Sequence, residues 1–247
     1  MTRPRLAALA VALVVAAPAA AQQGTPPRPT NLQVLPDSIG RDELIRTMRG
    51  FALALGVRCS HCHVEREVDG RVERDMANDA KPEKRIAREM MRMVASINER
   101  LTTLPERNDP PVQVRCATCH RGAAVPRLLE DTLMLAYELG GVDSLRATYH
   151  ALRGQHYGRG TYDFSDRPLA DFAANLLAED MPADATAVAA LNVQMNPQSV
   201  VAVNELARAS LAAGDSAAAL QWYRRILQLD PQNRDAQAAV ERLGAGR

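Results

Sequence analysis

The chain has 247 residues, which is enough for one large domain or two modest ones. Its formal net charge of +1 gives no electrostatic case for binding nucleic acid or an anionic membrane surface. Hydrophobic residues make up 47% of the chain, as in ordinary globular proteins, whereas aromatic residues make up only 4%.

Residues 1–21 have the pattern of a secretory signal peptide. Arg3 and Arg5 precede a short apolar run, which ends in the small residues Ala19 to Ala21 before Gln22. The run is shorter than the roughly 20 residues that a membrane-spanning helix needs. No cysteine follows the cleavage site to carry a lipid anchor, and no later segment is long and apolar enough to span a membrane. We therefore expect cleavage near Ala21 and a periplasmic location for the mature protein.

Composition and periodicity divide the rest of the chain into segments. Four follow in order: a flexible Pro-rich leader at 22–30, a cysteine-containing domain at 31–127, a helical linker at 128–162 and a helical repeat region at 163–247. The linker is predicted to form two short helices broken at Gly140-Gly141. The charged stretch at 65–85 is typical of a solvated loop that leads into a helix. No segment has a convincing strand pattern, so we expect an all-α protein.

The last segment contains an internal repeat of 34 residues. Asn196-Pro197 recurs as Asp230-Pro231, and small or apolar residues match at the same shift: Phe172 with Leu206, Ala173 with Ala207, Leu177 with Leu211, and Ala185 with Ala219. This period, with small residues at fixed places and a proline closing each unit, is typical of tetratricopeptide repeats. We expect tetratricopeptide-like helical hairpins, a capping helix at 233–243 and a concave surface that docks a partner.

All four cysteines lie in two short motifs of the same spacing. The motifs are Cys59-Ser60-His61-Cys62-His63 and Cys116-Ala117-Thr118-Cys119-His120. A zinc site or a disulfide would use the thiols, but neither gives a reason for a histidine after each second cysteine. In haem c attachment, two thiols one turn apart add to the haem vinyl groups and the histidine becomes the proximal iron ligand. The sequence therefore predicts two covalently bound haem c groups.

A helix before the first motif offers a sixth ligand to the iron. Haem iron used for electron transfer normally has Met or His opposite the proximal histidine. Met48 shares one face of the predicted helix with Leu44, Phe51 and Leu55, and Gly56 ends the helix. We therefore predict Met48 as the distal ligand of the first haem.

A second predicted helix, beginning at Pro82, precedes the second motif. Met90 and Met93 lie on its apolar stripe, whereas Met91 lies off it. Methionine on such a stripe is usually a core residue, but a haem that needs a distal ligand favours a ligand role. We predict Met90 as the distal ligand of the second haem, with Met93 as the alternative.

Three other histidines are weaker candidates for iron ligation. His150 and His156 stay open as alternatives, although both lie in the predicted linker. His61 lies inside the first motif and is expected to be exposed.

Four stretches together resemble the cytochrome c subunit of photosynthetic reaction centres. They are "NLQVLP" (31–36), "MRGFALALGVRCSHCHVE" (48–65), "KPEKRIAREMMRMVASIN" (81–98) and "VRCATCHRGAAVP" (114–126). The resemblance implies that a helix, a turn and a CxxCH segment hold each haem. It further implies these ligand sets: Cys59, Cys62, His63 and Met48 for the first haem, and Cys116, Cys119, His120 and Met90 for the second. The family subunit has four haems and no repeat tail, whereas this chain has motifs for two haems.

The leading hypothesis for function is an electron carrier that passes single electrons between redox partner proteins. The resemblance implies a membrane-bound reaction centre or a respiratory complex as the partner, and it leaves both a photosynthetic and a respiratory role open. Two alternatives belong to other classes: a dihaem peroxidase-type enzyme, and a haem-based redox or gas sensor. Both need an iron with an open or displaceable sixth position, and the methionine-bearing helices argue against one.

Overall fold

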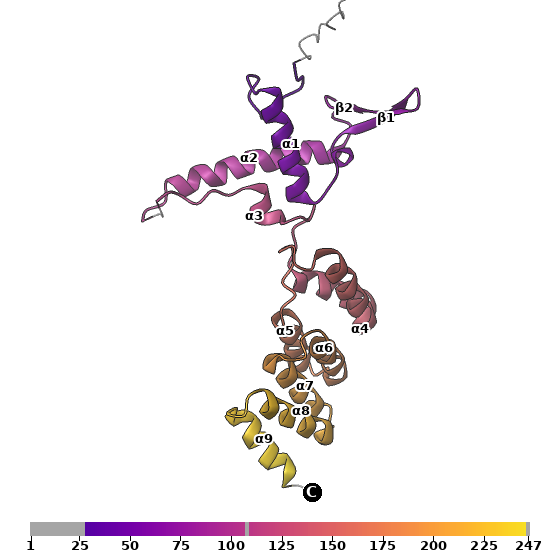
Figure 1. The fold of residues 1–247 in the computed structure, drawn as a ribbon, viewed down its shortest axis with the longest axis vertical. Coiled ribbons are helices and arrows are strands. Elements are labelled where there is room, and N and C mark those ends of the chain that lie inside the picture. Colours follow the sequence, from indigo (N-terminus) through magenta and orange to yellow (C-terminus); the bar gives the residue numbers. More distant parts are fainter. Residues whose placement is uncertain (1–27, 107–108, 246–247) are drawn as a thin grey trace, which may run out of the picture.

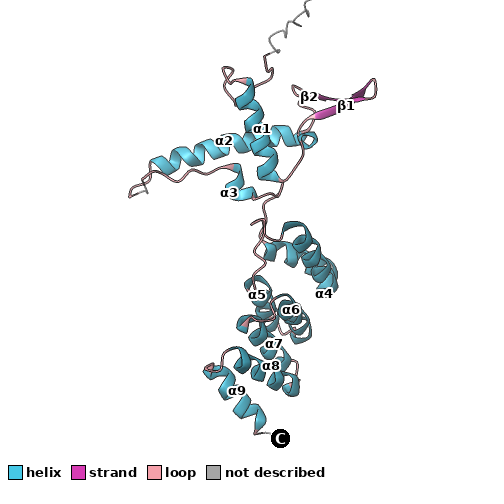
Figure 2. Cartoon of the chain, viewed as in Figure 1, coloured by secondary structure: helices cyan, strands magenta, loops and turns pink. Residues whose placement is uncertain are grey.

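The computed structural model describes residues 28–106 and 109–245, and the predicted signal peptide lies outside the described residues. The described chain is mainly helical, as predicted, and its strands are confined to one hairpin (Figure 2). Helices α1 to α3 and the hairpin gather at one end of the molecule, and α5 to α9 follow one another toward the C-terminus (Figure 1).

Helix α1 (Arg41–Leu55) leads into the first cysteine motif. Asp42 and Glu43 lie in its first turn, where carboxylates interact favourably with the free N–H groups of a helix. Gly56 ends the helix in the left-handed conformation, with φ of 66°. A single turn of 3₁₀ helix, Cys59–His61, follows.

An antiparallel β-hairpin corrects the expectation that the chain contains no strands. Strand β1 (Val64–Val68) pairs with β2 (Arg71–Asp75), and Val64 lies opposite Asp75. The turn Asp69-Gly70 has positive φ at both residues, 49° and 71°, as a two-residue hairpin turn requires. The first part of the stretch predicted as a solvated loop, residues 65–75, is therefore a solvated hairpin, because this turn pairs the two charged strands; a loop at 76–81 then leads into a helix, as predicted.

Helix α2 (Pro82–Thr102) and the short helix α3 (Cys116–His120) complete the first part of the chain. Pro82 occupies the first turn of α2, as predicted, where its missing N–H costs nothing. Asn98 of α2 holds the segment before α3: its side chain donates to the Val114 carbonyl at 2.9 Å and accepts from the Val114 N–H at 2.7 Å.

Helix α4 (Leu129–His156) has the predicted break. Gly140 and Gly141 have non-helical backbone angles, which divide α4 into two helical segments. The Tyr137 hydroxyl donates a hydrogen bond to Asp184 and so joins α4 to the following helices; this bond raises the pKa of Tyr137 to about 12.

The repeat region forms helical hairpins closed by a final helix. Its helices are α5 (Arg167–Ala178), α6 (Pro182–Met195), α7 (Val200–Ala212), α8 (Ser216–Leu229) and α9 (Arg234–Gly244). Each helix packs against the next from α5 to α9. Ala173, Ala185, Ala207 and Ala219, the small residues of the repeat, are all fully buried, which lets the paired helices approach closely. The expected capping helix is present as α9.

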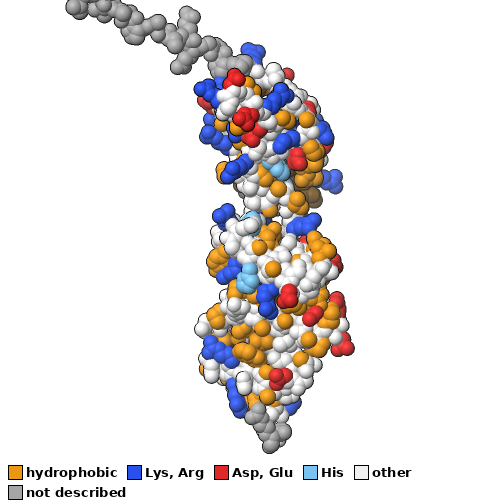
Figure 3. Space-filling view, turned by 90° about the vertical axis from the view of Figure 1, so that its right-hand side faces the viewer, with side chains coloured by type: hydrophobic (Ala, Val, Ile, Leu, Met, Phe, Trp, Pro, Cys, Tyr) orange, Lys and Arg blue, Asp and Glu red, His pale blue; other side chains and the backbone are white. Residues whose placement is uncertain are grey.

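The apolar core lies almost wholly in the second half of the molecule. Leu129, Leu133, Leu145 and Tyr149 of α4 share one buried cluster with α5 to α7. The segment predicted as a linker therefore packs as part of the repeat unit. Among the described residues before Leu129, Ala54 is the one apolar side chain that is buried. Hydrophobic side chains also appear on the surface along the length of the molecule (Figure 3).

Candidate functional site

Both cysteine motifs fold as single helical turns. In the first, the His63 N–H donates to the Cys59 carbonyl at 3.0 Å; in the second, the whole motif is helix α3. Each pair of cysteines is thus about one turn apart, as the sequence predicts. Cys62 and Cys116 are half-buried, Cys59 and Cys119 are exposed, and no disulfide joins any two of them. Within residues 28–106 and 109–245, no group of three His, Cys, Asp or Glu side chains is placed to share a metal ion.

Burial favours the neutral forms of Cys62 and His63. It raises the pKa of the Cys62 thiol, and Glu83 adds to this effect. It lowers the pKa of the His63 imidazole, and the positive charge of Lys84 adds to this effect. A neutral imidazole is the form that binds a metal, so this environment suits His63 as an iron ligand.

The two motif histidines differ in how their rings are held. The His120 Nδ1 lies 2.9 Å from the Ala123 carbonyl, and a hydrogen bond there places the ring proton on Nδ1. The other nitrogen, Nε2, is then the one left with a lone pair for a metal. The His63 Nδ1 is buried and has no hydrogen-bond partner among the described residues. The hydrogen bonding of His120 therefore suits a proximal iron ligand better than that of His63 does.

The candidate distal ligands lie where the helical pattern put them. Met48 is half-buried in α1 and Met90 is half-buried in α2, whereas the Met93 side chain is 46% exposed. Met91 is half-buried as well, so burial does not choose among the methionines of α2, and the order in which Met90 precedes Met93 stays a prediction.

The remaining histidines show one departure from expectation. His61 was expected to be exposed but is half-buried inside the first motif. His150 is exposed, and His156 packs edge-on against Tyr162 with ring centroids 5.2 Å apart. His156 is therefore already part of an aromatic contact of the α4–α5 region.

The helices that carry the candidate ligands present apolar side chains to the surface. The large apolar side chains exposed on them are Ile45 and Leu53 of α1 and Ile86, Met93 and Ile97 of α2. Leu53 is 79% exposed. Ile86, Met93 and Ile97 share one face of α2 with Met90, and globular proteins normally bury such a stripe. An apolar group bound at Met90 would meet this face, so the residues of α2 fit haem.

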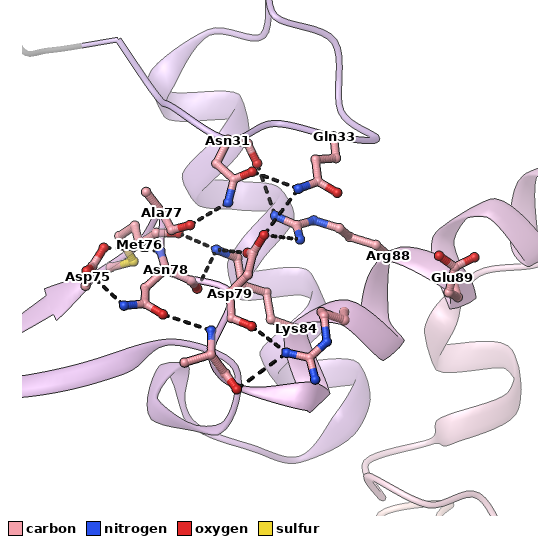
Figure 4. A network of polar contacts seen from close by, with 12 residues as sticks. Asn31, Gln33, Asp75, Met76, Ala77, Asn78, Asp79, Lys84, Arg88 and Glu89 are labelled. Carbon is pink, nitrogen blue, oxygen red and sulfur yellow. Dashed lines mark hydrogen bonds and ion pairs between the residues drawn. The ribbon is translucent and has the colours of Figure 1, made fainter.

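A polar network joins the start of the domain to α2 (Figure 4). Asp79 lies at its centre and forms ion pairs of 2.9 Å with both Lys84 and Arg88. Arg88 also donates to the Asn31 carbonyl at 3.2 Å, and Gln33 donates to Asp79 at 3.2 Å. Arg88 is the charged residue that this half of the described chain buries, and the network satisfies its charge.

A separate contact joins the start of α2 to the first motif. Lys81, which precedes α2, donates to the Ser60 carbonyl inside that motif. This bond ties the N-terminal end of α2 to the turn that carries Cys59 and Cys62.

Close backbone packing joins the end of α1 to the second motif. The Gly122 N–H donates to the Ala54 carbonyl at 2.8 Å. A Cβ atom on Gly56 would lie 2.1 Å from the Gly122 carbonyl oxygen, which no real side chain allows. Gly56 therefore has two reasons to be glycine: its positive φ and this contact between the two motif regions.

Sequence reasoning missed the network and the backbone contact. Asn31 lies inside the stretch 31–36 that supports the family resemblance, and Asp79 lies just before the stretch 81–98. Their contacts join residues 46 to 57 positions apart, and such contacts leave no periodic pattern in the sequence. The sequence indicated Gly56 as the end of a helix but not its contact with Gly122.

Two CxxCH turns, each preceded in the chain by a helix with a half-buried methionine, are characteristic of the class of c-type cytochromes. The sequence model of the family described as "Photosynthetic reaction centre cytochrome C subunit" matches residues 8–133, just over half of the chain. The chain therefore belongs to the photosynthetic reaction centre cytochrome c subunit family. Membership implies covalently bound haem c and a role as an electron carrier with a redox partner.

The matched residues end at the start of α4, so the repeat region lies outside the family match. Several solved structures are similar to part of the chain, and two of them are tetratricopeptide domains. The first tetratricopeptide domain of Spaghetti (RPAP3), bound to an HSP90 peptide, has 18% identity and covers 48% of this chain and 89% of its own, with a TM-score of 0.34. The first tetratricopeptide domain of the human RPAP3 protein has 18% identity, coverage of 47% and 87%, and the same TM-score.

A comparison with curated proteins finds no match to the chain. None of the helices in residues 28–106 and 109–245 combines the length and apolar character that crossing a membrane requires.

Proposed function

We propose that the chain is an exported dihaem c-type cytochrome that carries single electrons between redox partners. The observation that carries the proposal is the pair of CxxCH turns in a member of this family, each preceded by a helix with a half-buried methionine. Bound haem c supplies an iron that exchanges one electron at a time. The chain supplies anchors, ligands and an apolar surround.

The proposed roles of the residues follow their positions. Cys59 and Cys62 anchor the first haem by thioether bonds, and Cys116 and Cys119 anchor the second. His63 and His120 are the proximal iron ligands. Met48 and Met90 are the distal ligands, with Met93 as the alternative to Met90.

The proposal extends to location and domain organisation. Cleavage near Ala21 exports the chain to the periplasm, where the leader at 22–30 precedes a dihaem domain at 31–127. The segment at 128–162 packs with residues 163–247, and together they dock a redox partner, such as a membrane-bound reaction centre or a respiratory complex.

Replacing each methionine tests the ligand assignment. Met48→Ala and Met90→Ala should each remove part of the sulfur-to-iron charge-transfer absorption of the oxidised protein, because each loses one thioether ligand. Met91→Ala is the matched control, since Met91 is a half-buried residue of the same helix that lies off the stripe. An unchanged spectrum in Met48→Ala would show that the first assignment is wrong.

Reactivity separates electron carriage from the alternatives. A carrier with both sixth positions filled should exchange electrons rapidly with a second cytochrome, bind carbon monoxide slowly in the reduced state and turn over little peroxide. Rapid peroxide turnover by the purified holoprotein would favour the enzyme. Rapid carbon monoxide binding would favour the sensor.

A further inference from the structure

The three residues after His120, Arg121-Gly122-Ala123, form a tight turn that three partners hold; we call it the 121–123 turn. Arg121 has left-handed backbone angles, φ 46° and ψ 36°. The Gly122 N–H donates to the Ala54 carbonyl in the last turn of α1 at 2.8 Å. The Ala123 carbonyl faces the His120 Nδ1 at 2.9 Å. The turn therefore joins the end of α1 to the ring of His120.

The third partner comes from the repeat side of the molecule. Thr161, in the loop between α4 and α5, donates from its hydroxyl to the Arg121 carbonyl at 2.6 Å. Thr161 is only 4% exposed, although it is polar. A buried hydroxyl that lost this bond would carry the cost of an unpaired polar group. The bond is thus a firm contact between the 121–123 turn and the second half of the chain.

The repeat unit fixes the position of Thr161. Three residues later, Phe164 is buried and packs edge-on against Tyr149 of α4, with ring centroids 5.7 Å apart. Tyr162, which directly follows Thr161, packs against Phe164 and His156. Tyr149 and Phe164 belong to the core cluster of α4 to α7 and Tyr162 packs against it, so the segment that carries Thr161 is tied to that core.

The turn has little room to move between its partners. Gly122 has φ of +89°, and a Cβ atom on it would touch the Thr161 Oγ1 at 3.4 Å. On its other side, the Gly122 carbonyl presses against Gly56. The turn is therefore wedged between the end of α1 and Thr161, and a change at Thr161 reaches the carbonyl that His120 contacts.

We propose that Thr161 is a positioning residue for His120: its hydroxyl anchors the 121–123 turn to the repeat unit, and the turn fixes the His120 imidazole. The inference rests on the proposed function in one respect, since it takes His120 as the proximal ligand of the second haem. The bond from Nδ1 to Ala123 raises the basicity of a ligating imidazole and sets its orientation. A more basic ligand favours oxidised iron, so a loosened turn raises the reduction potential of the second haem and leaves the first haem unchanged.

Thr161→Val tests the inference because it removes the hydroxyl and keeps the side-chain shape. In the full-length holoprotein we expect an upward shift of one of two potentials and a changed electron paramagnetic resonance signal for the same haem. Met48→Ala, which perturbs the first haem, identifies which signal belongs to which site. Thr161→Ser retains the hydroxyl and should restore the wild-type values. Thr161→Ala removes the same hydroxyl without adding volume, and it replaces the valine variant if that variant does not fold.

Thr186→Val is the matched control. Thr186 is half-buried in α6, and its hydroxyl donates to the Pro182 carbonyl at 2.8 Å, within the repeats. It should leave both potentials unchanged. Wild-type potentials and signals in Thr161→Val, or equal shifts at both haems, would overturn the inference. Failure of the proposed function looks different: the wild-type protein would carry fewer than two haems, before any variant is compared.

Discussion

Gly56 has a left-handed backbone conformation, and the Gly122 carbonyl packs closely against it. Alanine at this position would therefore be strained in its backbone and would also clash with Gly122. The left-handed conformation alone costs a non-glycine residue about 1–2 kcal/mol, and the added Cβ would also displace the Gly122 carbonyl. We predict that Gly56→Ala lowers the free energy of unfolding of the holoprotein by at least about 1–2 kcal/mol. Gly50→Ala is the control, because Gly50 lies inside α1 with nothing within 4 Å of its added Cβ.

Denaturant unfolding of the two variants checks this prediction. Gly50→Ala should be neutral or stabilising by about 0.5–1 kcal/mol, since alanine is the better helix former. Equal stabilities of the two variants would contradict the contact between α1 and the second motif.

Asp79 gives a prediction for acid conditions. Hydrogen bonds from Arg88, and then from Asn31 and Lys84, hold the pKa of Asp79 well below its usual value of about 3.9. A lowered pKa means that the carboxylate stabilises the fold above about pH 4, and that this contribution is lost as the pH falls further toward the lowered pKa. The stability difference between wild type and Asp79→Asn should therefore be constant near neutral pH and shrink below about pH 4.

Unfolding of both proteins between pH 7 and pH 3 measures this difference. Glu89→Gln in α2 is the control, because the pair of Glu89 with Arg92 is exposed and such pairs contribute little. A difference between wild type and Asp79→Asn that does not change with pH would remove Asp79 from the centre of the network.

At this scale, the sequence predicted residues whose chemistry is set by local spacing. Cys59, Cys62 and His63 lie within one turn, so the sequence alone is enough to predict roles for them. Arg88 and Asn31 are 57 positions apart, and no local pattern links a buried arginine to a distant carbonyl. The bond from Thr161 to the Arg121 carbonyl spans 40 positions, so no local pattern predicts it either.

Asn98 shows how one side chain can hold two elements together. It pairs with both the N–H and the carbonyl of Val114, as a neighbouring strand would, and so ties α2 to the segment before Cys116. Asn98→Ala leaves both backbone groups without this partner. We predict a loss of about 1–3 kcal/mol in unfolding free energy, together with a perturbed spectrum of the second haem.

Ser96→Ala is the matched control, because Ser96 is exposed on the same helix. It should change neither stability nor spectrum. An unperturbed second haem in Asn98→Ala would show that the segment before Cys116 is positioned by other contacts.

Helices were predictable as elements, but the hairpin was not. The stripes of α1 and α2 repeat over several turns, so their period is clear. In the hairpin, charged residues alternate with few valines, and the apolar period-2 signal is weak; the Asp69-Gly70 turn was the usable sign. A turn with two left-handed residues defined the pairing where hydrophobicity did not.

The whole molecule divides into a half with its own core and a half without one. Residues from Leu129 onward bury nearly all the apolar core, whereas the part described before them buries one apolar side chain, that of Ala54. We predict that the chain without haem keeps residues 129–245 folded and leaves the first half open to proteolysis. Limited proteolysis of the unmatured chain, compared with the holoprotein, should yield a stable fragment beginning near Leu129.

The outcome of that comparison bears on both halves. Equal resistance of the two halves in the unmatured chain would show that the first half folds without an apolar partner.

The repeat pattern predicted the hairpins of α5 to α8 because a 34-residue period is a local signal. It did not predict that α4 joins them, since Leu133 and Tyr149 pack on distant helices without repeating their spacing.

The haem content of the exported protein tests the central claim most directly. Protein made in a host that matures c-type cytochromes should carry two haems per chain by pyridine haemochrome absorbance, and an intact mass raised by two covalently bound groups. Cys116→Ser with Cys119→Ser should retain one haem. A colourless wild-type protein, or one whose haem is released by denaturation, would contradict the account.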